Sequence, residues 1–328
     1  MTLSAIDRIA MNSAWLPHHL DFARRTVEFM RVPDGVFAEP GFLFEYNPSD
    51  PADRLMVSID RLRDIECDSI PVHFIFHTAF CRSTILARAL NIHGLAIGLS
   101  EPGIIGDLAS AGQQARPLYS QILRLLARKR HDARAVFIKP TNHANRIIPD
   151  LMEAAPCARA VLMTNPLASF LHSVRRRGLM GHRWGRKLYL EMQGYSGIDL
   201  GLSAEELFAM SDLQTAGMAW LLYQNYFTRI ASGPLGKRIR TLDGNFFNNH
   251  RGETIAAALS HCGVQSSGIT TDKMGQHVAF ASHSKLGGNF EEAAPDQSTE
   301  KEIEQVEQWI GMIADQMGLS IPVPQTLL

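Results

Sequence analysis

Short apolar runs alternate with helical patterns from residue 72 onward. Runs rich in β-branched and aromatic residues predict strands, and these cover 72–77, 95–99, 135–139, 160–164 and 238–242. Apolar residues at helical spacing follow most of them, over 83–90, 103–111, 117–130, 143–154, 166–177 and 252–262. Because strands that alternate with helices usually pair in parallel, the pattern predicts an α/β fold whose mainly parallel sheet is covered on both faces.

The segment before this region carries a weaker pattern. Residues 1–70 are predicted to be a helical or irregular preface that packs on the core. Phe22, Val27 and Met30 suit one helical face and predict a helix over 21–30, and a second helix is expected over 51–65.

Two further segments complete the predicted organisation. A helical insertion is expected over 180–232, where Ser203 and Glu206 have the spacing of a capping box. Residues 264–298 are poor in large apolar side chains, which is typical of a lid or a disordered loop. A last helix is expected from Thr299. The predicted parts are therefore 1–70, a core over 71–265 and a lid-like loop with a final helix over 266–328.

Composition narrows the class of protein. The chain has 328 residues and a net charge of −1, so it has no long-range attraction to nucleic acid or acidic membranes. Four dispersed cysteines without a C-x-x-C pair predict neither a disulfide framework nor a cysteine zinc site. No apolar run reaches the ~18 residues of a membrane helix, and the N-terminus does not resemble a signal peptide. A cytoplasmic protein without a required metal is expected.

The segment H-T-A-F-C-R-S-T (77–84) joins the first predicted strand to its helix. The first amides of a helix have no partner within it, so anions bind readily there. Ser83 and Thr84 add hydroxyl donors and Arg82 adds a fixed positive charge, although a Ser-Thr pair is also typical of a simple helix cap. The segment lacks the glycines and the lysine of G-x-x-x-x-G-K-[ST], which favours an anionic cofactor other than a triphosphate.

Cys81 raises a different hypothesis, because a cysteine beside Arg82 at a helix start is in a thiolate-favouring environment. A cysteine phosphatase would require C-x-x-x-x-x-R. Here Arg88 is one position too far along and lies inside the predicted helix.

The stretch H-F-I-F-H-T-A-F-C-R-S-T-I-L-A-R-A-L (73–90) resembles the 5′-phosphosulfate-binding segment of bacterial sulfotransferases that use 3′-phosphoadenylyl sulfate (PAPS). Four later segments are similar to that family in the same order: S-E-P (100–102), F-I-K-P-T-N-H (137–143), A-A-P-C-A-R-A-V-L-M-T-N-P (154–166) and R-I-R-T-L-D (238–243). The resemblance covers about 70–265 of the chain, with a weaker likeness at S-K-L-G-G (284–288). It implies a P-loop NTPase-like three-layer sandwich and transfer of a sulfuryl group from PAPS.

The resemblance also implies roles for single residues. Glu101 would be the catalytic base and Lys139 would stabilise transferring charge. Independently of the resemblance, His77 could orient phosphate or act as an acid, although a histidine at a strand end often only hydrogen-bonds the backbone. The residues expected to bind the cofactor are Phe80, Cys81, Arg82, Ser83, Thr84, Ser169, Ser173, Arg177 and Lys285. Structural explanations remain open: Glu101 as a turn residue or a partner of Arg82, Lys139 pointing to solvent, and the two helix serines as packing residues.

The chain departs from the family pattern at three positions. Phe80 stands where the family has a basic loop residue, Arg82 where it has a glycine, and Thr164 where it has the arginine of R-D-P. Arg82 could replace one lost cation. The basic run of Arg175, Arg176, Arg177, Arg183, Arg186 and Lys187 could supply the other, or could simply be a solvated helix end.

Three functions therefore follow as hypotheses. The first is a sulfotransferase acting on the hydroxyl or amine of a small-molecule or carbohydrate acceptor. The second is a P-loop kinase of a small molecule, for which Asp243 is the candidate Mg²⁺ ligand. The third is a non-catalytic nucleotide- or anion-binding protein. No nucleic-acid or membrane partner is expected, and the oligomeric state is left open.

Overall fold

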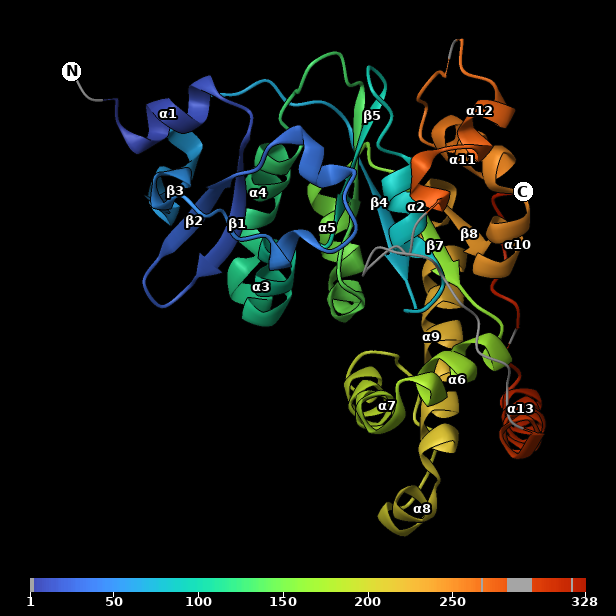
Figure 1. Ribbon diagram of the computed structural model, residues 1–328. Coiled ribbons are helices and arrows are strands. Elements are labelled where there is room, and N and C mark those ends of the chain that lie inside the picture. The colour runs from blue at the N-terminus through green and yellow to red at the C-terminus, as the bar shows by residue number, and fades with distance from the viewer. Residues whose placement is uncertain (1–2, 267, 282–296, 320) are drawn as a thin grey trace. The chain divides into compact units, whose positions relative to one another are not determined.

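The computed structural model describes residues 3–266, 268–281, 297–319 and 321–328. Its core sheet has five strands in the order β5-β6-β4-β7-β8 (Figure 1). The strands are β4 (Val72–His77), β5 (Ala96–Ser100), β6 (Ala135–Lys139), β7 (Ala160–Thr164) and β8 (Ile239–Asp243). Both β4 and β5 pair with β6 in parallel. Numbered along the chain, the order is 2-3-1-4-5, and the predicted α/β fold with a mainly parallel sheet is confirmed.

Burial explains why these strands read as continuous apolar runs. Every residue of β5, β6 and β7 is buried, as expected for parallel strands covered on both faces. A glycine in β5 permits the closest helix contact: a Cβ at Gly98 would overlap the carbonyl of Ala87 in α2 (Ser83–Ala89). The strand and the helix that flank the 77–84 loop are therefore both fixed in the core.

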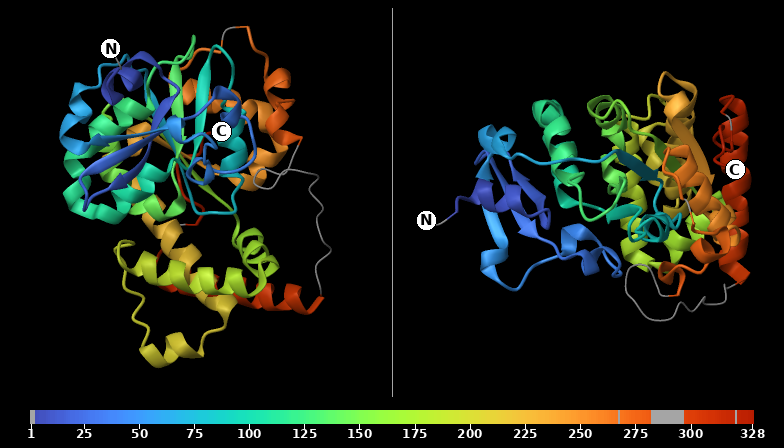
Figure 2. Two further views of the ribbon diagram at one scale, coloured as in Figure 1. Left: turned by 60° about the vertical axis from the view of Figure 1, so that its left-hand side comes forward. Right: turned by 90° about the horizontal axis from the view of Figure 1, so that it is seen from above.

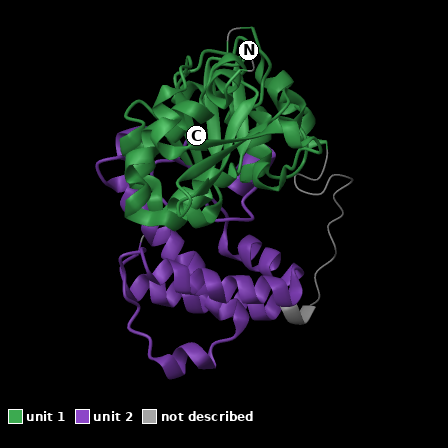
Figure 3. Cartoon of the chain, turned by 90° about the vertical axis from the view of Figure 1, so that its left-hand side faces the viewer, with its two compact units in different colours: residues 1–76, 83–161, 250–290 green, residues 77–82, 162–249, 291–328 purple. Residues whose placement is uncertain are grey.

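The chain divides into two compact units, which Figure 3 colours separately. The first unit comprises residues 1–76, 83–161 and 250–290, and the second comprises 77–82, 162–249 and 291–328. The first unit holds β4 up to Phe76, all of β5 and β6, and the start of β7. In Figures 1 and 2, α3 to α5 lie on one side of these strands, and α2 and α11 lie on the other. The helices of this unit, besides α2, are α3 (Gly103–Ala111), α4 (Tyr119–Leu126), α5 (Ile148–Ala154), α11 (Arg251–His261) and α12 (Thr271–Gly275).

The N-terminal segment is a second, antiparallel sheet, so the predicted helices over 21–30 and 51–65 are wrong. After α1 (Ala5–Met11), the strands β1 (Trp15–Asp21), β2 (Thr26–Arg31) and β3 (Arg54–Ser58) pair in chain order. The register of β1 shifts between Pro17 and His19, which interrupts the alternation that marks a strand. The sheet packs on α3 and α4.

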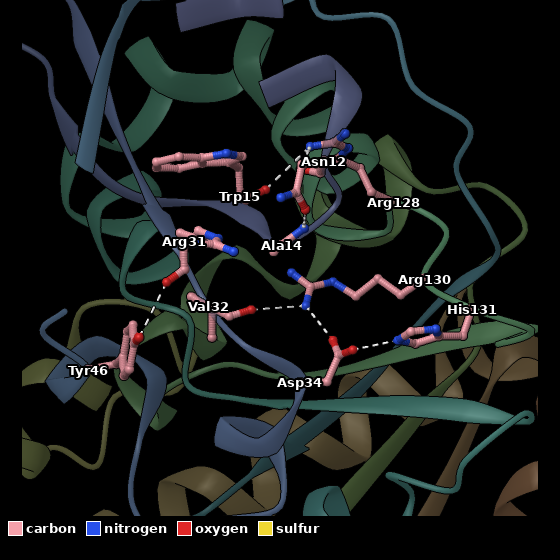
Figure 4. Close-up of polar contacts among 10 residues, drawn as sticks. All are labelled: Asn12, Ala14, Trp15, Arg31, Val32, Asp34, Tyr46, Arg128, Arg130 and His131. Carbon is pink, nitrogen blue, oxygen red and sulfur yellow. Dashed lines mark hydrogen bonds and ion pairs between the residues drawn. The ribbon is translucent and has the colours of Figure 1, made fainter. Parts of the chain in front are cut away.

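Two buried arginines attach this segment to the core of the first unit (Figure 4). Arg128 donates to the carbonyl oxygens of Asn12 at 3.1 Å and Ala10 at 2.8 Å. Arg130 donates to the carbonyl of Val32 at 3.2 Å and to Asp34 at 2.9 Å. Buried guanidinium groups need such partners because an unpaired one is costly to desolvate. The preface is therefore an integral part of the first unit.

The second unit is built around a long buried helix. It contains the 77–82 loop, the end of β7, β8, α6 (Leu167–Arg176), α7 (Gly178–Gln193), α8 (Ala204–Ala209), α9 (Asp212–Ser232), α10 (Gly244–Asn249) and α13 (Gln297–Gln316). α9 packs against α6, α7 and α13, and Gly217 of α9 faces Val306 and Ile310 of α13. The predicted capping box of Ser203 and Glu206 is present at the start of α8, and a second one, Ser211 with Gln214, begins α9.

Candidate functional site

The loop between β4 and α2 has a strained backbone. The predicted order of strand, tight loop and helix is confirmed: β4 ends at His77 and α2 begins at Ser83. Between them, Ala79 (φ 74°), Phe80 (φ 56°) and Arg82 (φ 63°) are left-handed although none is a glycine. Each such residue costs about 1–2 kcal/mol, and strain of this kind collects at functional sites. A run of left- and right-handed residues turns successive amides toward one concave side, which is how anion nests form.

Hydrogen bonds to residues of β4 and of the end of β7 hold this strained loop in place. The amide of Thr78 donates to the carbonyl of Met163 at 3.0 Å, and the amide of Ala79 donates to Nδ1 of His77 at 3.1 Å. The side-chain amide of Asn165, just after β7, donates to the carbonyl of Phe80 at 2.6 Å. The bond to His77 gives that residue a role in bracing the turn, and its catalytic role stays a prediction.

The start of α10 approaches the loop closely. A Cβ at Gly244 would clash with Oδ1 of Asn165 and would lie 2.5 Å from the carbonyl oxygen of Cys81. Only a glycine fits there. The buried Oδ1 of Asn165 has no hydrogen-bond partner among the described residues, so this side of the loop retains an unused acceptor.

A chain of polar contacts joins the loop to α6 through α10. Arg82 donates from Nη1 to Oδ1 of Asn245 at 3.0 Å, and Nδ2 of Asn245 donates to the hydroxyl of Ser169 at 3.1 Å. Ser173 donates its hydroxyl hydrogen to the carbonyl of Ser169 at 3.0 Å, the back-bonding typical of a helix serine. Ser169, Ser173 and Arg82, all predicted as cofactor-binding, thus belong to one connected group in the second unit.

Phe80 lies in an aromatic cluster formed with α6 and α7. Its ring centroid is 5.8 Å from that of Phe170 and 4.8 Å from that of Trp184. The guanidinium carbon of Arg177 lies 4.0 Å from the centre of the Phe80 ring. Burial, and then the charge of Arg176, lower the pKa of Arg177 below its ordinary value, yet an arginine remains charged at neutral pH.

Glu101 and Lys139 form an ion pair in the first unit. They stand at the carboxyl ends of adjacent parallel strands, where Ser100 pairs with Lys139 in the register of β5 and β6. The ammonium of Lys139 donates to Oε1 of Glu101. The two side chains are only 1% and 12% exposed, so the expectation that Lys139 points to solvent is wrong.

The backbone around Glu101 is also closely held. Glu101 is left-handed (φ 50°), its amide donates to the carbonyl of Lys139 at 2.7 Å, and its carbonyl accepts from the amide of Phe44 at 3.1 Å. The Lys139 Nζ lies 5.3 Å from the centre of the Phe42 ring. A carboxylate fixed this firmly at the ligand-binding edge of a parallel sheet fits a positioned base.

The remaining predicted residues have mixed surroundings. Ser83 and Thr84 are the first two residues of α2, and each is 4% exposed. Cys81 is fully buried, which speaks against the cysteine-phosphatase hypothesis because a nucleophilic thiolate must be reachable. Lys285 lies outside the described residues.

Sequence reasoning missed three residues that contact the loop or its arginine: Asn165, Gly244 and Asn245. All three follow strands, β7 or β8, where polar and glycine residues at a parallel sheet edge are a usable signal. In the segment T-N-P (164–166), the prediction concerned Thr164, which stands where the family has an arginine, and overlooked Asn165, which binds the carbonyl of Phe80.

Comparison with known proteins gives a limited picture. No family model matches the chain, and no curated protein matches its sequence. Among solved structures, the chain is similar to a sulfotransferase from Alicyclobacillus acidocaldarius, with 13% identity, a TM-score of 0.43 and coverage of 77% of this chain and 98% of that one. It is also similar to the sulfotransferase domain from the curacin biosynthetic pathway, with 12% identity, a TM-score of 0.42 and coverage of 78% and 100%. Within the described ranges, no helix combines the length and apolar character needed to cross a bilayer.

Proposed function

We propose that this chain is a sulfotransferase that moves a sulfuryl group from PAPS to a hydroxyl or amine acceptor. The observation that carries the proposal is the backbone of the 77–84 loop, in which three non-glycine residues hold left-handed conformations. Strain of this kind collects at functional sites, and a backbone that alternates between left- and right-handed residues can bind an anion, which supports a phosphate site in this loop.

The loop fits the 5′ end of the proposed cofactor. The amides that follow Phe80, with the hydroxyls of Ser83 and Thr84, would bind the 5′-phosphosulfate, and Arg82 would add a guanidinium. When bound, PAPS supplies a sulfuryl group on a phosphate leaving group. A sulfuryl group carries less negative charge than a γ-phosphoryl group, so its transfer needs amides, cations and alignment more than it needs a metal ion.

Ser169, Ser173 and Lys285 are the residues that we assign to the rest of the cofactor, and Arg177 is assigned to the cofactor as a cation. Ser169 is already bonded to Asn245, which also accepts from Arg82. Ser169 is therefore connected to the loop arginine through two hydrogen bonds, which supports the assignment.

We assign the proton transfer to Glu101. Its Oε1 accepts from Lys139, and its other oxygen, Oε2, would take the proton of the acceptor hydroxyl or amine. Lys139 would hold the carboxylate in one orientation and stabilise charge that develops during transfer. We further propose that the acceptor is a small molecule or carbohydrate.

Calorimetry on the full chain tests the proposal. The wild type is expected to bind 3′,5′-adenosine bisphosphate without a divalent ion, and Arg82→Ala is expected to weaken that binding by roughly 10- to 100-fold, the loss of one charge-assisted hydrogen bond. Arg183→Ala, an exposed arginine of α7, is the matched control and should bind as the wild type does.

The competing hypotheses give different results in the same experiment. A preference for ATP with Mg²⁺ would support the kinase hypothesis. Binding of neither nucleotide would support the third hypothesis, a non-catalytic protein that binds a different ligand. Glu101→Gln should bind the bisphosphate normally, because we place this residue on the acceptor side.

A further inference from the structure

Position 80 of the loop carries an aromatic ring with a cation on its face. Phe80 is left-handed (φ 56°), its carbonyl is fixed by Asn165, and its ring is fixed by Phe170 and Trp184. The Arg177 guanidinium carbon lies 4.0 Å from the ring centre, which is within the range of a cation–π interaction. A residue 97 positions later in the chain thus brings a positive charge to this loop position.

Arg177 differs in its contacts from the arginines around it. Arg175 forms an ion pair with Glu302 at 3.3 Å, and Arg186 forms one with Asp212 at 2.5 Å. No carboxylate among the described residues lies within ion-pair distance of Arg177. Among the described residues, the one hydrogen bond of its side chain runs from Nη1 to the carbonyl of Ser173 at 2.7 Å.

These contacts leave most of the guanidinium available. A guanidinium has five N–H donors in one plane. Stacking on Phe80 uses the face of that plane and the bond to Ser173 uses one donor, so the other edge can still bind an anion. Ordering by the ring and the helix carbonyl lowers the entropy that Arg177 would lose on binding.

We infer that Arg177, stacked on the ring of Phe80, is a second cation of the phosphate loop beside Arg82, and that Phe80 is its positioning residue. The inference rests on the proposed function and concerns only how this chain provides the positive charge. The ligand class is a phosphate or phosphosulfate monoester. The aromatic residue at position 80 does not remove a charge from the loop, because it holds one supplied by the turn between α6 and α7.

The test is calorimetric binding of 3′,5′-adenosine bisphosphate to variants of the full chain. Arg177→Gln keeps the stem without the charge and should weaken binding roughly 10- to 100-fold. Phe80→Ala keeps the charge of Arg177 but removes the ring on which it stacks, and should weaken binding roughly 2- to 5-fold. Arg176→Gln, the adjacent exposed arginine, is the matched control and should stay within about 2-fold of the wild type.

Rescue separates a binding role from a structural one. Phe80→Lys placed in the Arg177→Gln background puts the cation on the loop itself and should recover most of the lost affinity, which repair of helix packing alone would not do. Equal affinities of Arg177→Gln and Arg176→Gln would overturn the inference while leaving the proposed function standing. A wild-type chain that binds no bisphosphate would overturn both. If the rescue variant fails to fold, the comparison of the two glutamine variants still decides.

Discussion

The buried pair of Lys139 and Glu101 predicts a strongly non-additive stability change. With side chains 1% and 12% exposed, neither charge can be fully hydrated if its partner is lost. Removing one member of such a pair costs about 3–5 kcal/mol, whereas replacing both with uncharged residues of similar shape is often close to neutral. Lys139→Met should therefore destabilise the chain by about 3 kcal/mol, near the lower limit because Glu101 keeps some solvent contact.

The double variant Lys139→Met/Glu101→Gln carries no charge at either of these two positions. We expect it to be within about 1–2 kcal/mol of the wild type, so that adding the second substitution restores stability. This gives a coupling free energy of about 2 kcal/mol or more between the two positions, which is large for residues that do not share a packed cavity.

Urea unfolding of the full chain, followed by far-ultraviolet circular dichroism, measures these differences through the midpoint of the transition. Lys129→Met is the matched control, because Lys129 is exposed in the same unit and should change stability by no more than about 0.5 kcal/mol. The reasoning is refuted if Lys139→Met costs no more than Lys129→Met, or if the double variant shows the simple sum of its two single changes.

Three further predictions address other contacts. Gly244→Ala should destabilise the chain by about 2 kcal/mol or more in thermal unfolding, because the new Cβ has no space beside the Cys81 carbonyl. As a control, the new Cβ of Gly311→Ala on α13 meets no atom within 4 Å, so this variant should stabilise the chain by roughly 0.5–1 kcal/mol. Asn245→Ala should weaken bisphosphate binding in calorimetry with about 1 kcal/mol of stability lost, because it releases Arg82; unchanged binding would contradict this link. Burial, followed by the nearby charges of His261 and Arg159, lowers the pKa of His73 from 6.5 to about 4. As the pH falls from 7 to 5, this histidine therefore becomes protonated in the unfolded chain but stays neutral in the folded chain. The free energy of unfolding should fall by about 2 kcal/mol over that range. His73→Asn should flatten this dependence in urea titrations at the two pH values, and an equal pH slope in both proteins would count against it.

The parallel core could be predicted from sequence because its signal is local and repeated. β4, β6 and β7 have the predicted bounds, and β5 and β8 differ from theirs by one residue at each end. Parallel strands that are buried on both faces are apolar over most of their length, so each one stands out as a short apolar run. The helix Gly103–Ala111 was also predicted with its observed bounds.

The N-terminal sheet could not be predicted for the opposite reason. Thr26–Arg31 gains its strand conformation from partners on β1 and β3, and Val27, Phe29 and Met30 are all buried, which breaks the alternation of a half-exposed strand. Pairing between distant segments is invisible to a local pattern. The same holds for the candidate site, where the roles of Asn165 and Asn245 depend on contacts that join separate strand ends.

Departures from a familiar motif were informative in this chain. Arg82 keeps the left-handed backbone at a position where the sulfotransferase pattern has glycine, and Phe80 carries Arg177 where that pattern has a basic residue. The sequence shows only that the expected residues are missing. The structure adds that Ala79, Phe80 and Arg82 turn the backbone without a glycine and that the guanidinium of Arg177 stacks on Phe80.

A crystal structure of the chain with bound 3′,5′-adenosine bisphosphate tests the central claim most directly. The account predicts a phosphate oxygen within about 2.7–3.2 Å of backbone amides between Cys81 and Thr84, with Ala79, Phe80 and Arg82 still left-handed. A phosphate bound elsewhere, with these amides facing only water, would contradict it.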